Sequence, residues 1–412
     1  MKLLCQFLAA GFLLSVCMQN VNATEFADGR IRLSGFGTLG LTHAGTNRIG
    51  FRKDLTHDGQ FGSVAVRSDS VFGLQLDADI LPKVSATVQA IAKESVRYDF
   101  QDIVDWAYLS YQAAPNFRVR GGRMAVDLYM LSEYRNVAFA YLWTHPVIEF
   151  YAPLPFTHFD GMDFKYTHST ASGNIEFKIF GGYVHNDVTV YRGINHVELF
   201  PLVGANVVYD AFDWKMRISF ATAEVKSFKN PLDPLLNPLS QMPTIIWPQA
   251  PDYSNKLSGD GKRVNYLSAG YFYDKNKWIV QAEVAWAFSN WELTNMFNGY
   301  VSAGRRFGPF TIYSTVSGAK TLTGETKVTR PLLPLSQLNV LQVATQTALN
   351  AARIDQRTFS LGARWDIHPQ VAIKAQWDHT WIGKHGGLLL QNELLDKNTE
   401  LDIFSLNLSF IF

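Results

Sequence analysis

The sequence predicts an all-β fold, a transmembrane barrel closed from sixteen antiparallel strands, and three observations point to it. Apolar and polar residues alternate with period two over many segments of about ten residues. Aromatic residues make up 14% of the chain, which is more than a soluble protein usually needs. The connections between the predicted strands alternate between short turns and long loops, as they do in membrane barrels.

Residues 1–23 have the pattern of a cleaved signal peptide. Lys2 supplies a basic start, an apolar run extends from Leu3 to Met18, and Ala23 is a small residue before the cut. The run is short for a transmembrane anchor, which needs about 20 apolar residues. We therefore expect cleavage after Ala23, export, and a single barrel domain over residues 24–412.

The composition of the mature chain excludes several classes of protein. Cys5 and Cys17 both leave with the signal peptide, so a disulfide-stapled secreted domain is not expected. A lipoprotein anchored through Cys17 would need a small residue where Val16 stands. Of the 37 Lys and Arg, only Lys2 leaves with the signal peptide, so 36 remain against 36 Asp and Glu, and this balance gives no electrostatic case for nucleic acid as a partner. No later segment is apolar enough for a transmembrane helix.

Sixteen segments carry the alternation that is typical of a strand with two different faces. The last one is the clearest, because its apolar and polar residues occupy alternate positions up to the C-terminal residue. The predicted strands are Ile31–Thr42, Ser70–Ile80, Val84–Lys93, Ile103–Gln112, Phe117–Arg123, Phe159–His168, Asn174–Val184, Leu202–Ala211, Trp214–Glu224, Arg263–Asp274, Lys277–Phe288, Phe297–Phe307, Phe310–Ala319, Arg357–Ile367, Val371–Trp381 and Leu401–Phe412.

Every second connection is a tight turn built from residues such as Pro82, Asn116 and Gly308. The others are mostly long, and they include 43–69, 124–158, 225–262, 320–356 and 382–400. A soluble sandwich would not sort its loops in this way. Within 320–356, the apolar spacing predicts a short amphipathic helix, which would cap the mouth, act as a lid or simply pack as a loop. Its residues are Leu335, Leu338, Leu341, Ala344, Ala348 and Leu349.

The two strand faces differ in charge, and this difference assigns one to lipid and one to a wet interior. A Lys or Arg side chain in the hydrocarbon midplane would cost about 2–4 kcal/mol. The predicted lipid face includes Phe72, Leu74, Leu76, Ile175, Phe177, Ile179, Trp214, Met216, Ile218, Phe220, Trp278, Val280, Ala282, Val284 and Trp286. The predicted inner face carries Asp77, Asp79, Arg118, Arg120, Lys165, Glu176, Lys178, Lys215, Arg217, Glu283, Arg364, Lys374 and Asp378. Arg305 is the exception, because it falls on the lipid face close to the turn at Gly308.

The connection 124–158 is the third long loop, and here the chain resembles the Gram-negative outer-membrane porin family. Gly122 and Arg123 are similar to the Gly-Arg step that precedes the constriction loop in that family, although Met124 replaces its Gln and the family's Pro-Glu-Phe-Gly-Gly-like motif is absent. Phe410 and Phe412 are similar to the signal read by the barrel-assembly machinery. The resemblance implies a third loop folded into the lumen, a homotrimer, and an outer membrane containing lipopolysaccharide.

The interior of a sixteen-stranded barrel leaves an aqueous channel. We therefore expect passive diffusion of small hydrophilic solutes and ions, filtered by an eyelet of opposed charges. In that hypothesis acids on the third loop face bases on the wall; in the alternative, the same residues pair with one another and only hold the loop against the wall. The candidate constriction residues are Arg118, Arg120, Asp127, Glu133, Glu149, Lys165, Lys178, Lys215 and Arg217.

Two other functions compete with a general diffusion channel. A substrate-selective channel of the same fold would take sugars or small organic anions. An outer-membrane barrel enzyme is the remaining alternative, but we find no nucleophile-elbow or P-loop motif and expect no catalytic residues. Asp77 and Asp79 share a strand face, yet lumen charges balanced by nearby bases explain them better than a cation site, and we expect no metal and no cofactor.

Overall fold

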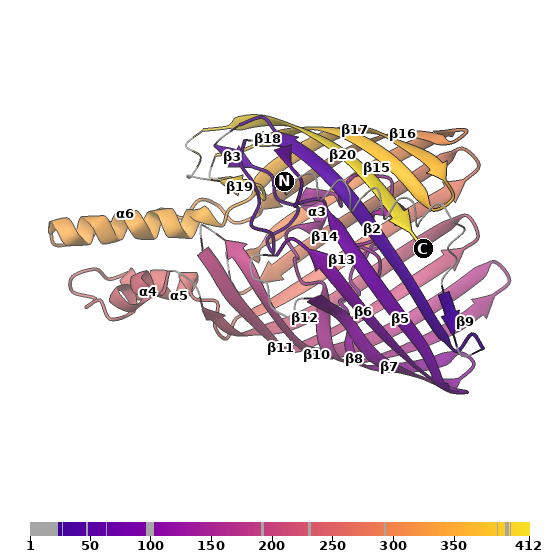
Figure 1. Cartoon of the computed structure of the whole chain (residues 1–412). Helices are drawn as coiled ribbons and strands as arrows, with labels where there is room; N and C mark the ends of the chain where they lie inside the picture. Colours follow the sequence, from indigo (N-terminus) through magenta and orange to yellow (C-terminus); the bar gives the residue numbers. More distant parts are fainter. Residues whose placement is uncertain are drawn as a thin grey trace, which may run out of the picture.

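A computed structural model describes residues 24–412, except 27, 47, 63, 96–102, 191–192, 230–231, 292–293, 385, 392–394 and 396. The predicted signal peptide therefore lies outside the described residues. Sixteen long strands form one closed sheet (Figure 1). They are β2 Ile31–Ala44, β5 Val71–Leu81, β6 Val84–Lys93, β7 Val104–Ala114, β8 Phe117–Ala125, β9 His158–Thr170, β10 Gly173–Val190, β11 Gly193–Ala211, β12 Trp214–Lys229, β13 Arg263–Lys275, β14 Trp278–Ser289, β15 Met296–Phe307, β16 Phe310–Thr321, β17 Asp355–His368, β18 Val371–Ile382 and β20 Thr399–Ile411.

The barrel closes because the first long strand pairs with the last. On one edge of β2, Gly37 pairs with Phe410 of β20, and on the other edge Phe36 pairs with Gly73 of β5. Consecutive long strands pair antiparallel around the rest of the sheet. The fold class and all sixteen predicted strands are thereby confirmed. Four short strands are added: β1 Thr24–Phe26, β3 Ile49–Gly50, β4 Val64–Ala65 and β19 Leu390–Gln391.

The strands β10 and β11 extend well past the ends that the sequence predicts. A β-bulge interrupts the alternation in β11, where the register shifts between Leu199 and Leu202. Phe200 and Pro201 both lie on the exposed side, so the period-two pattern is interrupted there. Residues 184–190 and 193–202 are therefore the two sides of a tall pair of strands.

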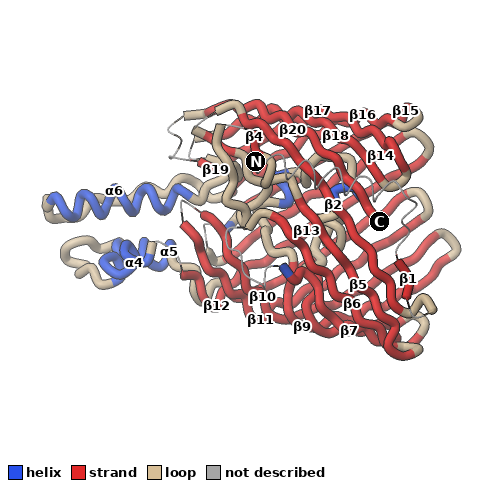
Figure 2. The backbone as a smooth tube through the Cα atoms, in the orientation of Figure 1, coloured by secondary structure: helices blue, strands red, loops and turns tan. Residues whose placement is uncertain are grey.

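Figure 2 shows tight turns at one rim of the barrel and the longer segments at the other. Three helices project from the long-loop rim: α4 Asp233–Ser240, α5 Ala250–Leu257 and α6 Ser336–Ala351. The helix α6 confirms the amphipathic helix predicted within 320–356. Among the described helices, none has both the length and the apolar character to cross a membrane.

The two faces of the sheet have the chemistry that the sequence predicts. Outward residues are exposed, with Ile218 at 61% and Ile179 at 59%, whereas the inward charges Glu283 and Lys374 are 2% and 0% exposed. The one conflicting residue, Arg305, lies 5.3 Å from the ring centres of both Trp278 and Phe307. These outward rings lie near the short-turn rim, where an arginine can reach the membrane interface.

Candidate functional site

The connection between β8 and β9, residues 126–157, lies inside the barrel, and we call it the lumen loop. It contains the 3₁₀ helix η1 Ala138–Ala140 and the short helix α3 Ile148–Tyr151. Its hydrogen bonds reach inner-face residues of β7, β8, β10 through β18, and β20. A segment that contacts nearly the whole inner circumference must cross the lumen.

One side of the lumen loop is held by a buried cluster of charges around Asp127. Its carboxylate pairs with both Lys178 and Arg217, and Asn206 donates to it at 3.2 Å. Burial opposes ionisation of Asp127, but Arg217 and Lys178 outweigh that effect and hold its pKa well below the usual range. The loop carboxylate therefore stays charged, and it ties the loop to β10, β11 and β12.

Glu133 is the more accessible acid of the same cluster. Its carboxylate lies 3.3 Å from the ammonium of Lys178 and 3.4 Å from the guanidinium of Arg120. Arg120 also forms a buried ion pair with Asp163 of β9 and lies over the ring of Tyr108. The side chain of Glu133 is 48% exposed, so it combines attachment to the wall with access to solvent.

Glu149 lies on the opposite side of the lumen, away from the basic cluster. Its carboxylate accepts hydrogen bonds from Gln356 at 2.6 Å, from Thr358 and from Ser317 at 2.7 Å. All three donors are neutral side chains of β16 and β17. In the structure Glu149 therefore anchors α3 to the wall, and does not face Arg118, Arg120 or the other bases.

Two inward charges of β14 and β18 also bind the loop. Glu283 accepts from the backbone N–H of Met130 at 2.8 Å and from the hydroxyl of Tyr300 at 2.7 Å. The ammonium of Lys374, fully buried, donates to the carbonyls of Ala138, Tyr141 and Trp143. Sequence reasoning placed both charges inside the barrel but did not assign them to the loop, because their partners are mostly backbone groups.

The remaining predicted residues lie outside this charge cluster. Lys165 pairs with Glu176 at 2.6 Å and Lys215 with Asp210 at 2.8 Å. Both pairs connect neighbouring strands across the inner face near the short turns. Arg118 sits beside Lys165 in the β8–β9 register, and its buried Nε has no hydrogen-bond partner among the described residues.

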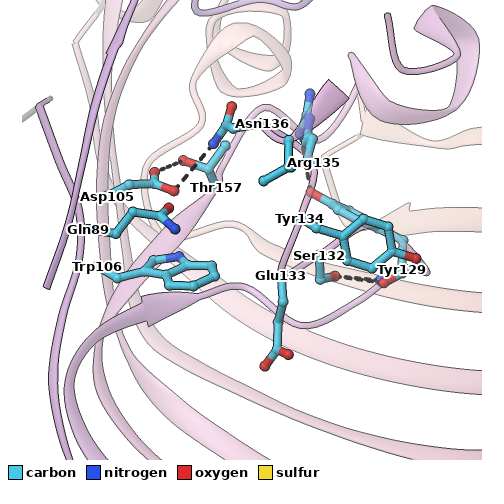
Figure 3. Close-up of a pocket in the computed structure, with 11 residues that line it drawn as sticks. Gln89, Asp105, Trp106, Tyr129, Ser132, Glu133, Tyr134, Arg135, Asn136 and Thr157 are labelled. Atoms are coloured by element: carbon cyan, nitrogen blue, oxygen red, sulfur yellow. Dashed lines mark hydrogen bonds between the residues drawn. The ribbon is translucent and has the colours of Figure 1, made fainter. Parts of the chain in front are cut away.

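The lumen loop leaves a narrow gap at the wall formed by β6 and β7 (Figure 3). Gln89, Asp105 and Trp106 line the gap from the wall, and Glu133 and Tyr134 line it from the loop. The cavity there measures about 10 Å³, which is room for about one water molecule. Asn136 and Thr157 donate to Asp105 at 3.3 and 3.2 Å, and these bonds close one end of the gap.

The wall beside this gap is polar and is not covered by hydrogen bonds to the loop. Asp77 of β5 accepts from Gln75 at 2.8 Å and from Thr87 at 2.7 Å, while Gln89 donates to Gln75. Over the described residues, no hydrogen bond joins the lumen loop to β5 or β6. In the same residues, no group of three or more His, Cys, Asp or Glu side chains is placed to hold a metal ion.

The fold is shared with solved outer-membrane channels at very low sequence identity. The outer-membrane channel DcaP of Acinetobacter baumannii superposes with a TM-score of 0.56 at 9% identity, over 95% of this chain and 100% of that one. OmpF of Salmonella typhi, in complex with daunomycin, gives 0.54 at 13% identity over 94% and 100%. The anion-selective porin from Comamonas acidovorans gives 0.53 at 9% identity over 93% and 99%.

No family model matches the sequence, and no curated protein is significantly similar to it. The structural likeness nevertheless extends over almost the whole of each chain. The chain therefore has the fold of the sixteen-stranded outer-membrane porins.

Proposed function

We propose that this chain is an outer-membrane porin that lets small hydrophilic solutes and ions diffuse passively through its lumen. The observation that carries the proposal is the reversal of polarity across the wall, with an exposed apolar outer face and a buried inner band of charged and amide side chains. Sixteen strands enclose more space than their own side chains fill. Solutes then need no energy source, since they move down their own gradients.

The setting of this channel is inferred from the sequence. Export uses the signal peptide 1–23, and Phe410 and Phe412 on the last strand recruit the barrel-assembly machinery. The mature chain lies among outer-membrane lipids and lipopolysaccharide, with the long loops outside the cell. We propose a homotrimer with one pore in each subunit, since the resemblance stated above implies it.

For the route of permeation, we propose the space between the polar wall of β5–β7 and the lumen loop. Glu133 faces this space and is half-exposed, so it is the strongest candidate for setting ion preference. Arg120 and Lys178 neutralise part of its charge. Asp127 and Arg217 form a buried ion pair with each other, so neither contacts a permeating solute. They affect permeation only by fixing the position of the loop.

Single-channel recording of the refolded protein tests the proposal. We expect discrete conductance steps, and we expect Glu133→Gln to shift the reversal potential towards anions because one accessible negative charge is lost. Asp213→Asn is the matched control, since Asp213 pairs with Lys275 in an exposed turn far from the loop. A protein that inserts but shows no steps would refute the channel. Unchanged selectivity in Glu133→Gln would remove Glu133 from the filter.

A substrate-selective channel is the second candidate, and one observation favours it. The lumen loop is bonded around nearly the whole inner wall, and the gap at β6 and β7 admits about one water molecule. A lumen that is largely occupied by the loop discriminates between solutes more sharply than an open eyelet. Block of the current by one class of solute at low concentration would distinguish this candidate from a general diffusion channel.

A further inference from the structure

The inner wall of β10–β15 changes from polar to apolar towards the long-loop rim. At the level of the lumen loop it carries Lys178, Asn206 and Arg217, each of which binds the loop. Beyond that level the inward positions are filled by apolar side chains, which are buried or half-buried. They are Val184, Val188, Val197, Leu199, Leu202, Ala221, Ala223, Val225, Val264, Ala287 and Met296.

These side chains line a cavity of about 750 Å³ that is open to solvent. The segment Pro153–Phe156 of the lumen loop borders it on one side. Leu257 at the end of α5 and Ala348 near the end of α6 border it at the rim. The cavity has the size of a small-molecule site, for which volumes of about 300–1,000 Å³ are typical.

The lining is not what an aqueous vestibule requires. The inner surface of a conducting barrel is normally polar, and an apolar constriction in a pore tends to expel water. The apolar residues cannot be explained as contacts with lipid either, because they point into the barrel. They pack on one another and on Leu55, Leu154 and Phe156, but no described side chain fills the cavity that they line. An apolar molecule would supply that missing contact surface.

Among the described residues of the lining, the two charged ones are Arg52 and Arg353, and both are cationic. Arg52, 7% exposed, donates from Nε to the carbonyl of Leu388 and from Nη1 to that of Thr189, both at 2.8 Å, and both of these residues line the cavity. Arg353 donates to the carbonyls of Thr323 and Gly324. Neither guanidinium forms an ion pair with a carboxylate among the described residues. Burial lowers the pKa of Arg52 to about 10, with Asp54 opposing the shift, so the group remains charged at neutral pH.

Tyr266 also borders the cavity, but its hydroxyl is covered by protein atoms and does not reach that space. The hydroxyl of Tyr266 on β13 is buried and has no hydrogen-bond partner among the described residues. Buried hydroxyls are normally paired. Because that hydroxyl is covered, the polar group that a bound anion would meet on this side of the cavity is the guanidinium of Arg52.

We propose that this cavity is a binding site for an amphipathic carboxylate, a molecule with an apolar body and one anionic group. The body lies against the apolar wall of β10–β15, and the carboxylate is directed to the Arg52 side of the cavity. The inference rests on the proposed channel function and narrows its substrate class. The cavity would concentrate the molecule at the outer mouth before it meets the lumen loop.

The first test uses octanoate, octanol and acetate as probes of current through the inserted channel. Octanoate added on the long-loop side is expected to reduce the current saturably, and acetate is expected to leave it unchanged. Octanol is expected to act about tenfold more weakly, because it lacks the charge that Arg52 would bind. Equal effects of octanol and octanoate would overturn the role of the anionic group. Equal effects of acetate and octanoate would overturn the apolar site.

The second test does not depend on conduction, because Trp291 lines the cavity and reports on it directly. In protein held in amphipol, 8-bromooctanoate is expected to quench Trp291 saturably. The Trp291→Phe variant isolates this signal from that of the lipid-facing tryptophans. A quenching curve that is identical in the wild type and Trp291→Phe would overturn the proposal. If Trp291 is quenched while no channel is observed, the site stands and the channel function fails.

Two substitutions separate occupancy of the cavity from general damage. Ala223→Phe fills the cavity and is expected to abolish both the block and the Trp291 quenching, whereas Arg52→Gln is expected to weaken octanoate binding but not octanol binding. Val340→Phe on the exposed side of α6 is the matched control. Open-channel conductance without a probe shows that each variant is folded. Unchanged octanoate binding in Ala223→Phe would place the site elsewhere.

Discussion

The substitution Asp127→Asn tests whether buried charge pairs hold the lumen loop in place. The side chains of Asp127, Lys178 and Arg217 are 7%, 6% and 10% exposed. The amide keeps the shape of the carboxylate but leaves two buried cations without their shared counter-charge. We therefore expect this side of the loop to detach, while Glu149 and Lys374 still hold the other side.

The magnitude follows from the burial. Removing one member of a buried ion pair costs about 3–5 kcal/mol. Even at the lower end, the equilibrium between attached and detached loop shifts by about a hundredfold. The exposed pair of Asp213 with Lys275 is 39% and 49% exposed, and losing such a pair costs about 0–1 kcal/mol. Asp213→Asn is therefore the matched control.

The assay is single-channel conductance, combined with the temperature at which the folded band disappears on a gel run without boiling. Asp127→Asn is expected to raise the conductance, add gating noise and lower that temperature. Asp213→Asn should leave all three close to the wild type. If both variants behave alike, the reasoning that the Asp127 cluster fixes the loop is wrong.

Three further outcomes follow from the structure. The pKa of Asp127 is depressed in the folded state, so the stability that its ion pairs contribute is present above the unfolded pKa of about 3.9 and is lost only as the pH falls through the lower folded pKa. Conductance titrated from pH 7 to pH 4 should therefore show no step from release of the loop. A step near pH 4 would contradict the buried pair. Gly122 has φ of +131°, and a Cβ there would meet the carbonyl of Ala107, whereas a Cβ on Gly121 has space. Gly122→Ala should therefore lower the yield of folded barrel, and lower the gel transition temperature by an amount equivalent to about 1–3 kcal/mol. Gly121→Ala should stay near the wild type, and equal behaviour of the two variants would contradict this placement. Phe412→Ala removes the ring that packs on Gly35 beside the pairing of β2 with β20. The amount of membrane-inserted protein in cells should fall several-fold compared with that of the control Phe404→Leu, which lies on the outer face. Equal amounts for the two variants would show that Phe412 has no role in assembly.

The strands could be predicted because their two faces meet different solvents. Where the inner face is charged and the outer face apolar, as around Arg217 and Ile218 in β12, alternation is visible in the sequence. The ends of β10 and β11 were missed where this contrast disappears. Val188 and Leu199 point inward and are as apolar as the lipid-facing residues, so period two carries no signal there. The same loss of contrast concealed the apolar cavity.

Which inward charges bind one another could not be predicted. The sequence indicates that Asp127 and Glu149 lie on one loop, but not that α3 turns Glu149 towards neutral donors on β16 and β17. Lys374 is a similar case, because its partners are three backbone carbonyls, which carry no signature in residue type. Only the path of the loop through the lumen brings these groups together.

The attachments of the lumen loop also determine the order of folding. Lys374 of β18 binds Ala138 across 236 residues of sequence, and Asn407 of β20 binds Thr144 across 263. Contacts of such long range form late, because the intervening chain must be ordered first. Until the last hairpin docks, the loop lacks its partners on β18 and β20, and a protease should cut within 138–144 in assembly intermediates. The completed barrel protects that segment, so resistance to cleavage there would mark the moment of closure.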